Sequence, residues 1–168
     1  MNDEFSIKEL IEFRLEANKV TSIEKKNKVP STRFDSGDHE YTNGPYTYHD
    51  TYVGGSCFAG QEAIWYKGEI KYVMNYMARI IDHRFRGDFL LKVLIAANRD
   101  MPFRGPKEFE ADGYKYVSEV QGDISWFQGH EEVFYDGDIK VYECYFSGCL
   151  TKSSTTTPTI GFIFDEKE

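Results

Sequence analysis

Two glutamates, Glu62 and Glu131, are the residues of this chain whose type and spacing could do chemistry. They lie 69 positions apart, and each sits inside a similar local sequence. Two carboxylates that face one cleft can share general acid and general base work, as in the hydrolysis of glycosidic bonds. A hydrolase that uses this pair is therefore one hypothesis, and binding of a cationic ligand by the same two carboxylates is another.

A structural role for the two glutamates competes with both hypotheses. If each glutamate lies in a hairpin with a two-residue turn, Glu62 is a diagonal neighbour of Lys71, and Glu131 is one of Lys140. Opposite charges in that relation contribute about 0.2–1 kcal/mol to sheet pairing. Because both partners recur in both local sequences, we favour the structural pair, with ligand contact next and catalysis last.

The glutamates belong to an internal repeat. Residues 55–80 align with residues 124–149 at an offset of 69, without a gap, and nine of the 26 aligned pairs are identical. Chance at this composition would give roughly two identities, and the turn, aromatic and charged positions also match in kind. The repeat predicts two related hairpins, with Asp136-Gly137 as the stronger of the two turn signals. A pseudo-symmetric fold follows from this prediction.

The hydrophobic pattern predicts an α+β fold. Helical spacing of apolar residues predicts a helix over about 6–19, with Ser6 as its N-cap, and a second helix over about 88–99. Alternating residues predict two three-stranded units, at about 46–77 and 113–146. We therefore expect one antiparallel sheet built from two pseudo-symmetric units, each preceded by a helix.

The domain organisation is predicted to be simple. We expect a single domain over residues 1–168, in which 46–80 and 114–149 are the repeated parts. Residues 151–159 are a polar, Thr-rich linker, and a possible last strand follows at 160–164. A chain of this length can bury about 70% of its unfolded surface in one core.

Two further expectations concern the connections. Residues 20–45 are polar and contain Pro30, Gly37 and Gly44, so we interpret them as a long excursion over the surface. Asp88 is expected to cap the second helix, and Pro102 to prevent its continuation.

Composition and charge argue against several classes of protein. The net charge of −8 disfavours a nucleic-acid partner, which needs lysine and arginine to neutralise phosphates. No run approaches the roughly 18 apolar residues of a membrane span, and the first residues show no signal-peptide pattern. Three cysteines, an odd number without CxxC spacing, indicate reduced thiols. We therefore expect a cytoplasmic location, with neither nucleic acid nor membrane as a partner.

Metal and cofactor motifs are absent from the sequence. The four histidines show no metal-ligand spacing, and there is no GxSxG, P-loop, HExxH or GxGxxG motif. We therefore expect no metal and no cofactor.

The aromatic residues are expected to divide between the two faces of the sheet. Trp65 shares one face with Ile70, and we expect that face to pack against the helices. Tyr66 lies on the other face with Glu62, and a concave face of this kind would suit a flat or cationic ligand. The alternative is that this face is simply the second side of a tyrosine-rich sheet.

Arg104 lies in a loop restricted by Pro102 and Pro106, so its guanidinium is presented at a fixed place. It could hold a carboxylate or phosphate of a ligand, or it could tie the loop to an internal acidic residue, which we favour. The candidate ligand site between the two repeats includes Tyr48, Tyr52, Glu62, Tyr76, Arg104, Trp126 and Glu131.

Several of these residues stand in a motif that resembles the signature of a bacterial family of unknown function. The resemblance rests on Tyr48-x-Asp50-x-Tyr52-x-Gly54-Gly55-x-x-Phe58-x-Gly60-Gln61-Glu62, and continues through Met74-Asn75-Tyr76, Pro102-Phe103-Arg104-Gly105-Pro106, Phe127-x-Gly129-x-Glu131 and Tyr145-x-x-Gly148. Members of that family stand alone or follow the helix-turn-helix domain of Xre-type transcriptional regulators. The resemblance implies a sensing or partner-binding module, and it names no reaction.

Three functional hypotheses follow from the sequence. The first is non-enzymatic binding of a small molecule or protein partner, in a regulatory context, at the aromatic and acidic face. The second is the hydrolase that uses Glu62 and Glu131. The third is self-association, for example as a homodimer, through an exposed sheet edge.

Overall fold

A computed structural model describes residues 5–23 and 27–151 of the chain. In this part of the chain two helices and nine strands form, which confirms the predicted α+β class. In chain order they are α1 (Ile7–Ile23), β1 (Lys28–Val29), β2 (Gly37–Asn43), β3 (Tyr46–Gly54), β4 (Cys57–Tyr66), β5 (Glu69–Ile80), α2 (Gly87–Ile95), β6 (Glu108–Ala111), β7 (Tyr114–Asp123), β8 (Trp126–Tyr135) and β9 (Ile139–Leu150). The predicted linker at 151–159, apart from Thr151, and the strand at 160–164 lie outside the described residues.

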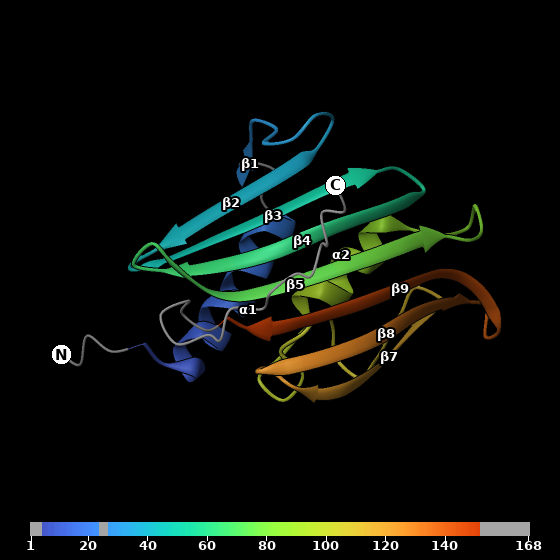
Figure 1. Cartoon of the computed structure of the whole chain (residues 1–168). Helices are drawn as coiled ribbons and strands as arrows, with labels where there is room; N and C mark the ends of the chain where they lie inside the picture. The colour runs from blue at the N-terminus through green and yellow to red at the C-terminus, as the bar shows by residue number, and fades with distance from the viewer. Residues whose placement is uncertain (1–4, 24–26, 152–168) are drawn as a thin grey trace, which may run out of the picture.

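The strands form one antiparallel sheet in the order β1-β2-β3-β4-β5-β9-β8-β7-β6. β5 and β9 pair at its centre, so the two ranges predicted to carry three strands each, β3–β5 and β7–β9, lie side by side. Both helices lie on one side of the sheet (Figure 1). The other side carries no helix in the described part of the chain.

Helix α1 begins as predicted. The backbone N–H of Glu9 donates to Ser6 Oγ at 3.5 Å, and the N–H of Leu10 donates to the Ser6 carbonyl at 3.0 Å, so Ser6 caps the helix. The helix continues past the predicted end to Ile23. Its buried face contains Leu10, Phe13, Arg14 and Ala17, which are all at most 5% exposed.

Helix α2 is shorter than predicted and capped differently. It begins at Gly87 and ends at Ile95, and the N-cap residue is Arg86, without a side-chain cap. Asp88 is therefore not the cap; it lies in the first turn and forms an ion pair with Arg86 at 2.8 Å. Soon after the helix ends, Asn98 Oδ1 accepts hydrogen bonds from the N–H groups of Asp100 and Met101, a local turn that competes with the helix directly before Pro102.

The prediction of a surface excursion over 20–45 is wrong, because α1 and β2 fall in this range. β2 pairs with β3 over its whole length. Its polar sequence hides the alternation of buried and exposed residues that is typical of a strand. Asp38 is nevertheless fully buried, and it accepts hydrogen bonds from Ser36 and Thr32. Tyr41 stacks on Phe13 of α1, with ring centroids 5.9 Å apart. Long-range pairing, not local propensity, makes this segment a strand.

A bulge changes the register of the β4–β5 hairpin. Tyr66 pairs with Glu69, as the predicted two-residue turn requires, but the register shifts between Ile64 and Trp65, so Ile64 pairs with Tyr72. A bulge inserts one residue into a strand and disturbs the pairing beyond it. Glu62 therefore pairs with Met74, and the predicted diagonal relation to Lys71 is wrong.

The β8–β9 hairpin has its own bulge, between Val133 and Phe134, and a longer turn. Lys67 and Gly68 both have positive φ, as a type I′ turn requires, and so do Asp136 and Gly137. The second turn contains three residues, because Tyr135 pairs with Ile139. When the two repeats are aligned without a gap, the pairing of β8 with β9 therefore differs by one residue from the pairing of β4 with β5.

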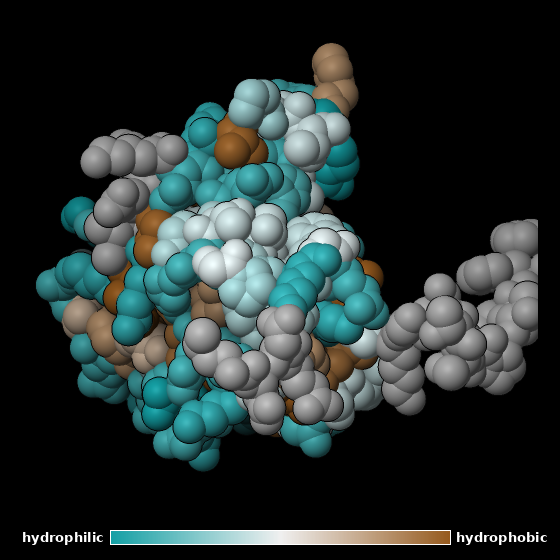
Figure 2. Space-filling view, turned by 90° about the vertical axis from the view of Figure 1, so that its left-hand side faces the viewer, coloured by the Kyte–Doolittle hydropathy of each residue, from teal (hydrophilic) through white to brown (hydrophobic). Residues whose placement is uncertain are grey.

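The helix-covered face of the sheet forms the core, and it is not the face that we predicted. Tyr66 contacts Phe5 in an edge-to-face arrangement, and Tyr46 stacks on Phe13 of α1 at 5.0 Å. Trp65, on the opposite face, is half-buried. The tyrosine and glutamate side chains expected to line an open concave face are thus packed under the helices. At the end of the molecule that carries the β2–β3 and β4–β5 turns, apolar residues appear as separate patches among hydrophilic ones (Figure 2).

Candidate functional site

Glu62 on β4 is held by Arg14 on α1. Arg14 Nη2 donates to Glu62 Oε2 at 2.6 Å, and the side chains are 0% and 8% exposed. The same guanidinium donates to the carbonyls of Pro102 and Phe103, so it also ties α1 to that loop. Burial is the largest single effect and lowers the pKa of Arg14, but the Glu62 carboxylate, followed by Tyr72 and Tyr48, raises it, and together they keep that pKa above its ordinary value.

Glu131 on β8 is held in a corresponding way by Arg104. Arg104 Nε donates to Glu131 Oε1 at 2.8 Å, and both side chains are buried. Tyr116 donates to the other oxygen at 2.8 Å, and Tyr142 to the first at 3.2 Å. The guanidinium carbon of Arg104 lies 4.9 Å from the centre of the Tyr76 ring, in a cation–π contact. This geometry confirms the prediction that Arg104 ties its loop to an internal acidic residue.

These contacts explain why the two glutamates are not placed for acid–base chemistry. Each carboxylate is buried and accepts a hydrogen bond from an arginine, so it is engaged in an internal ion pair. The predicted lysine partners are elsewhere: Lys71 pairs with Glu69 at 2.9 Å, and Lys140 pairs with Glu132 at 2.7 Å.

Asp50 connects the buried charges to the centre of the sheet. It pairs in register with Glu62, and it accepts a hydrogen bond from the Tyr76 hydroxyl at 2.8 Å. Burial, followed by the nearby negative charge of Glu62, raises the pKa of Asp50 to about 7. The charge of Asp50 therefore changes near neutral pH.

A groove of about 850 Å³ crosses the sheet where its two halves meet. Twelve of its fifteen lining residues follow the strand register across β5, β9, β8 and β7 in three rows, and the others are Met101, Lys107 and Ser118. The floor row consists of Tyr76, Phe146, Gly129 and Val120, which are register partners in that order. The side chains of Tyr76 and Phe146 point into the core, so this row contributes its backbone to the floor. On the core face, Gly129 leaves space that the buried Phe146 ring fills, because a Cβ at this position would lie 2.3 Å from that ring. The groove is therefore built into the pairing of the strands.

A row of uncharged polar side chains forms one side of the groove. This polar row consists of Gln61, Asn75, Ser147, Gln128 and Gln121, which are register partners from β4 to β7 and are all exposed. Its last four members line the groove. Gln61 Nε2 donates to Asn75 Oδ1 at 2.8 Å, and Gln128 Nε2 donates to Gln121 Oε1 at 3.1 Å.

The opposite side of the groove carries a mixed row, which consists of Met77, Tyr145, His130 and Glu119. Met77 is 64% exposed and Tyr145 is 54% exposed, and the His130 ring stacks on Tyr145 with centroids 4.4 Å apart. On the far side of the polar row, Trp126 is 77% exposed. Exposed apolar and aromatic side chains beside a groove are typical of a binding surface.

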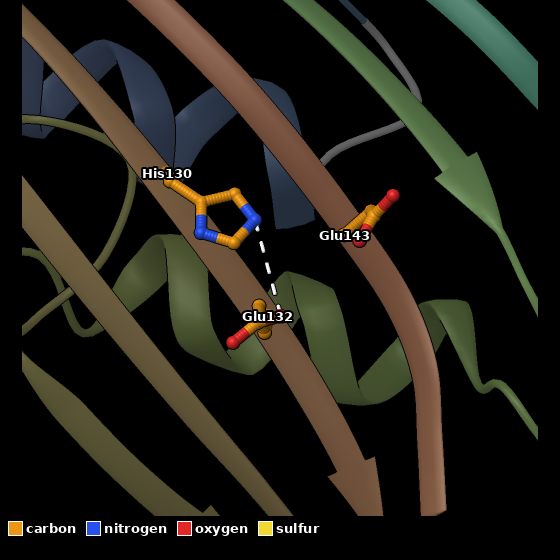
Figure 3. Close-up of side chains that lie close together, drawn as sticks. All are labelled: His130, Glu132 and Glu143. Atoms are coloured by element: carbon orange, nitrogen blue, oxygen red, sulfur yellow. Dashed lines mark ion pairs between the residues drawn. The ribbon is translucent and has the colours of Figure 1, made fainter.

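His130, Glu132 and Glu143 bring three possible metal ligands together on β8 and β9 (Figure 3). Their ligand atoms lie within 4.8 Å of one another. Lys140 Nζ already contacts Glu132 at 2.7 Å and Glu143 at 3.0 Å, and Arg79 contacts Glu143 at 2.6 Å. Hydrogen bonds from Lys140, followed by those from Arg79, lower the pKa of Glu143. The two cations thus balance the two carboxylates, and the cluster forms an ion-pair network.

The structure separates the predicted site residues. Tyr48 and Glu131 are buried in the core, as are Glu62 and Arg104 in their ion pairs. Tyr52 is half-buried, and its ring stacks on His39. Tyr76 lies in the floor row, and Trp126 is exposed next to the polar row.

The polar row is what the sequence interpretation missed. Gln61 was noted as a neighbour of Glu62, but Asn75, Ser147 and Gln128 carry no charge or motif that marks a site. The signal that could have found them is alternation: each stands one residue away from a buried position, on a strand of the predicted hairpins. Assembling them into a row requires the correct register.

Comparisons with known proteins give a family and no further relatives. No curated protein and no solved structure matches the chain. Within the described residues, no helix is long and apolar enough to cross a membrane. A family model described as a domain of unknown function, DUF5680, matches residues 50–151, which include β4, β5, α2 and β6–β9. The chain therefore belongs to the DUF5680 family.

Proposed function

We propose that this protein is a non-enzymatic binding module whose ligand site is the groove across β5, β9, β8 and β7. The observation that carries the proposal is the alignment of three register rows into one groove of about 850 Å³. A volume of this size accommodates a small molecule. The strongest acid–base candidates are buried in ion pairs instead of facing this groove.

The buried ion pairs have a supporting role in this proposal. Arg14 links α1 to β4 and to the loop at Pro102, and Arg104 links the same loop to β8. Tyr76 connects the buried ion pairs to the groove, because it lines the groove, donates to Asp50 and contacts Arg104. We propose that these residues hold the floor of the groove in place, and that Trp126 and the rows contact the ligand.

We also infer that the two halves of the sheet arose by duplication and function in a regulatory context. Support for duplication comes from the bulges of the two inner hairpins, at Ile64/Trp65 and Val133/Phe134, which correspond in the ungapped alignment. Support for the regulatory context is the resemblance to proteins that follow Xre-type helix-turn-helix domains. A partner protein, including a second copy of this chain, is the alternative ligand of the groove.

A thermal-shift screen with a metabolite library tests the proposal. Ser147 lies in the polar row, and the Ser147→Trp variant should fill the groove while keeping a residue that suits a strand. Thr42→Trp is the matched control, because Thr42 is an exposed strand residue on β2, far from the groove in the strand order. We expect compounds that raise the melting temperature of the wild type and of Thr42→Trp, but not of Ser147→Trp. Equal shifts in all three proteins would contradict the proposal.

A further inference from the structure

We propose that the ligand of the groove is a neutral, hydroxyl-rich chain of rings, that is, an oligosaccharide, which lies over the polar row between Tyr145 and Trp126. This inference rests on the proposed function and names the class of ligand. It follows from the charge, the hydrogen-bonding groups and the exposed aromatic side chains of the uncovered face.

The polar row is uncharged, although the chain carries a net charge of −8. Its five members are amides and a hydroxyl, and they cross five neighbouring strands without an acidic or basic side chain. Within the groove lining, the carboxylate is that of Glu119, and the ammonium group is that of Lys107 near the β7 edge. A strongly charged ligand would lack counter-charges along the row. The surface therefore suits a neutral ligand.

The hydrogen-bonding groups of the row match hydroxyl groups. An amide side chain offers both donors and an acceptor, and a sugar hydroxyl likewise donates and accepts. The bond between Gln61 and Asn75 uses one amide hydrogen and one amide oxygen, which leaves the Gln61 oxygen and the Asn75 N–H groups for a ligand. The bond between Gln128 and Gln121 leaves the corresponding groups. The row thus presents donors and acceptors in alternation.

Two exposed aromatic side chains stand on opposite sides of the polar row. Tyr145 is a register partner of His130, and Trp126 is a register partner of Cys149, four residues further along β9. At about 3.3 Å per residue, these positions are roughly 13 Å apart along the strand, with Ser147 midway. The C–H faces of sugar rings are apolar and pack on aromatic rings. A saccharide chain that follows the polar row across β9 and β8 would therefore have Tyr145 on one flank and Trp126 on the other.

Fluorescence provides a readout specific to this face. The chain contains two tryptophans, Trp65 and Trp126, so the Trp65→Phe variant has Trp126 as its single tryptophan. We would titrate this variant with three neutral hexasaccharides: β-1,4-linked glucose, β-1,4-linked N-acetylglucosamine and α-1,4-linked glucose. We expect at least one to shift the emission of Trp126 to shorter wavelength in a saturable way, and calorimetry of the wild type to show the same affinity.

Variants then test the contact residues. Trp126→Ala and Gln128→Ala should each weaken binding of that hexasaccharide by about tenfold or more. Phe34→Ala is the control and should bind like the wild type, because Phe34 is 99% exposed and lies in the segment between β1 and β2. Unchanged affinity in Trp126→Ala would overturn the proposal, as would the absence of a signal with all three sugars.

The two proposals fail in different ways. If no hexasaccharide binds, but library compounds still stabilise the wild type and not Ser147→Trp, the groove binds a ligand and only the sugar class is wrong. If sedimentation shows a dimer that Trp126→Ala dissociates, the face is an interface between copies, and the sugar proposal is overturned.

Discussion

Arg14 on α1 and Glu62 on β4 form a buried ion pair at 2.6 Å, although they are separated by 48 positions in the sequence. The pair joins the first helix to the centre of the sheet. The same arginine reaches the loop at Pro102 and Phe103, the loop from which Arg104 holds Glu131. The two glutamates are therefore linked through this loop, as parts of the framework below the groove.

Removal of one partner of this pair should be costly. Arg14→Met leaves the Glu62 carboxylate buried without its cation, and we expect a loss of about 3–5 kcal/mol in the free energy of unfolding. The double variant Arg14→Met/Glu62→Leu should recover a large part of this loss, because it removes both charges. Urea unfolding of the three proteins measures the effect. The exposed pair of Arg86 and Asp88 provides the control, since Asp88→Asn should leave stability nearly unchanged. A small effect of Arg14→Met would contradict the role assigned to the pair.

The pH dependence of stability should depend on Asp50. Its pKa in the folded protein is raised to about 7 from the ordinary value of 3.8, so the folded state binds more protons than the unfolded state between these values. The contribution of Asp50 to stability is therefore full below pH 4 and is lost as the pH rises toward 7.

The Asp50→Asn variant should abolish this contribution while its amide oxygen still accepts the hydrogen bond from Tyr76. Between pH 5 and pH 8, the free energy of unfolding measured in urea should fall less for Asp50→Asn than for the wild type. Parallel pH profiles of the two proteins would show that Asp50 does not titrate in this range.

Gly129 should resist substitution because the groove floor packs against it. In Gly129→Ala the new Cβ would approach the Phe146 ring to 2.3 Å and the Glu119 carbonyl to 3.0 Å. We expect a loss of about 1–3 kcal/mol from overpacking. Gly55→Ala is the matched control, since no atom lies within 4 Å of the corresponding Cβ and its φ is not positive. Equal stability of the two variants would mean that the floor is looser than described.

The sequence was sufficient for both helices and for six of the nine described strands, and insufficient for the register. Helix α1, its Ser6 cap and the turns at Lys67-Gly68 and Asp136-Gly137 follow from local signals, and they were predicted. β2 was not predicted, because its polar residues are stabilised by pairing with β3 and by burial of Asp38, which are long-range effects. Boundaries that depend on tertiary contacts, such as the end of α2, were also missed.

In the candidate site, too, the features set by local sequence were predicted and those set by long-range contacts were missed. Glu62 and Glu131 were identified as paired structural residues, but with the wrong partners, because a bulge at Ile64/Trp65 cannot be read from the alternation of residues. Arg14 lies within the predicted first helix, and nothing local indicates a partner 48 positions away. The polar row depends on the pairing of β5 with β9, which joins segments of the chain that are far apart in sequence.

The most direct test of the binding proposal is to map a bound ligand by amide chemical shifts in ¹⁵N-labelled protein. A compound that stabilises the wild type should shift the amide signals of Asn75, Gly129 and Ser147, and leave those of Gly44 and Gly68 in the distant turns unchanged. Shifts confined to residues outside β5, β7, β8 and β9 would contradict the groove as the ligand site.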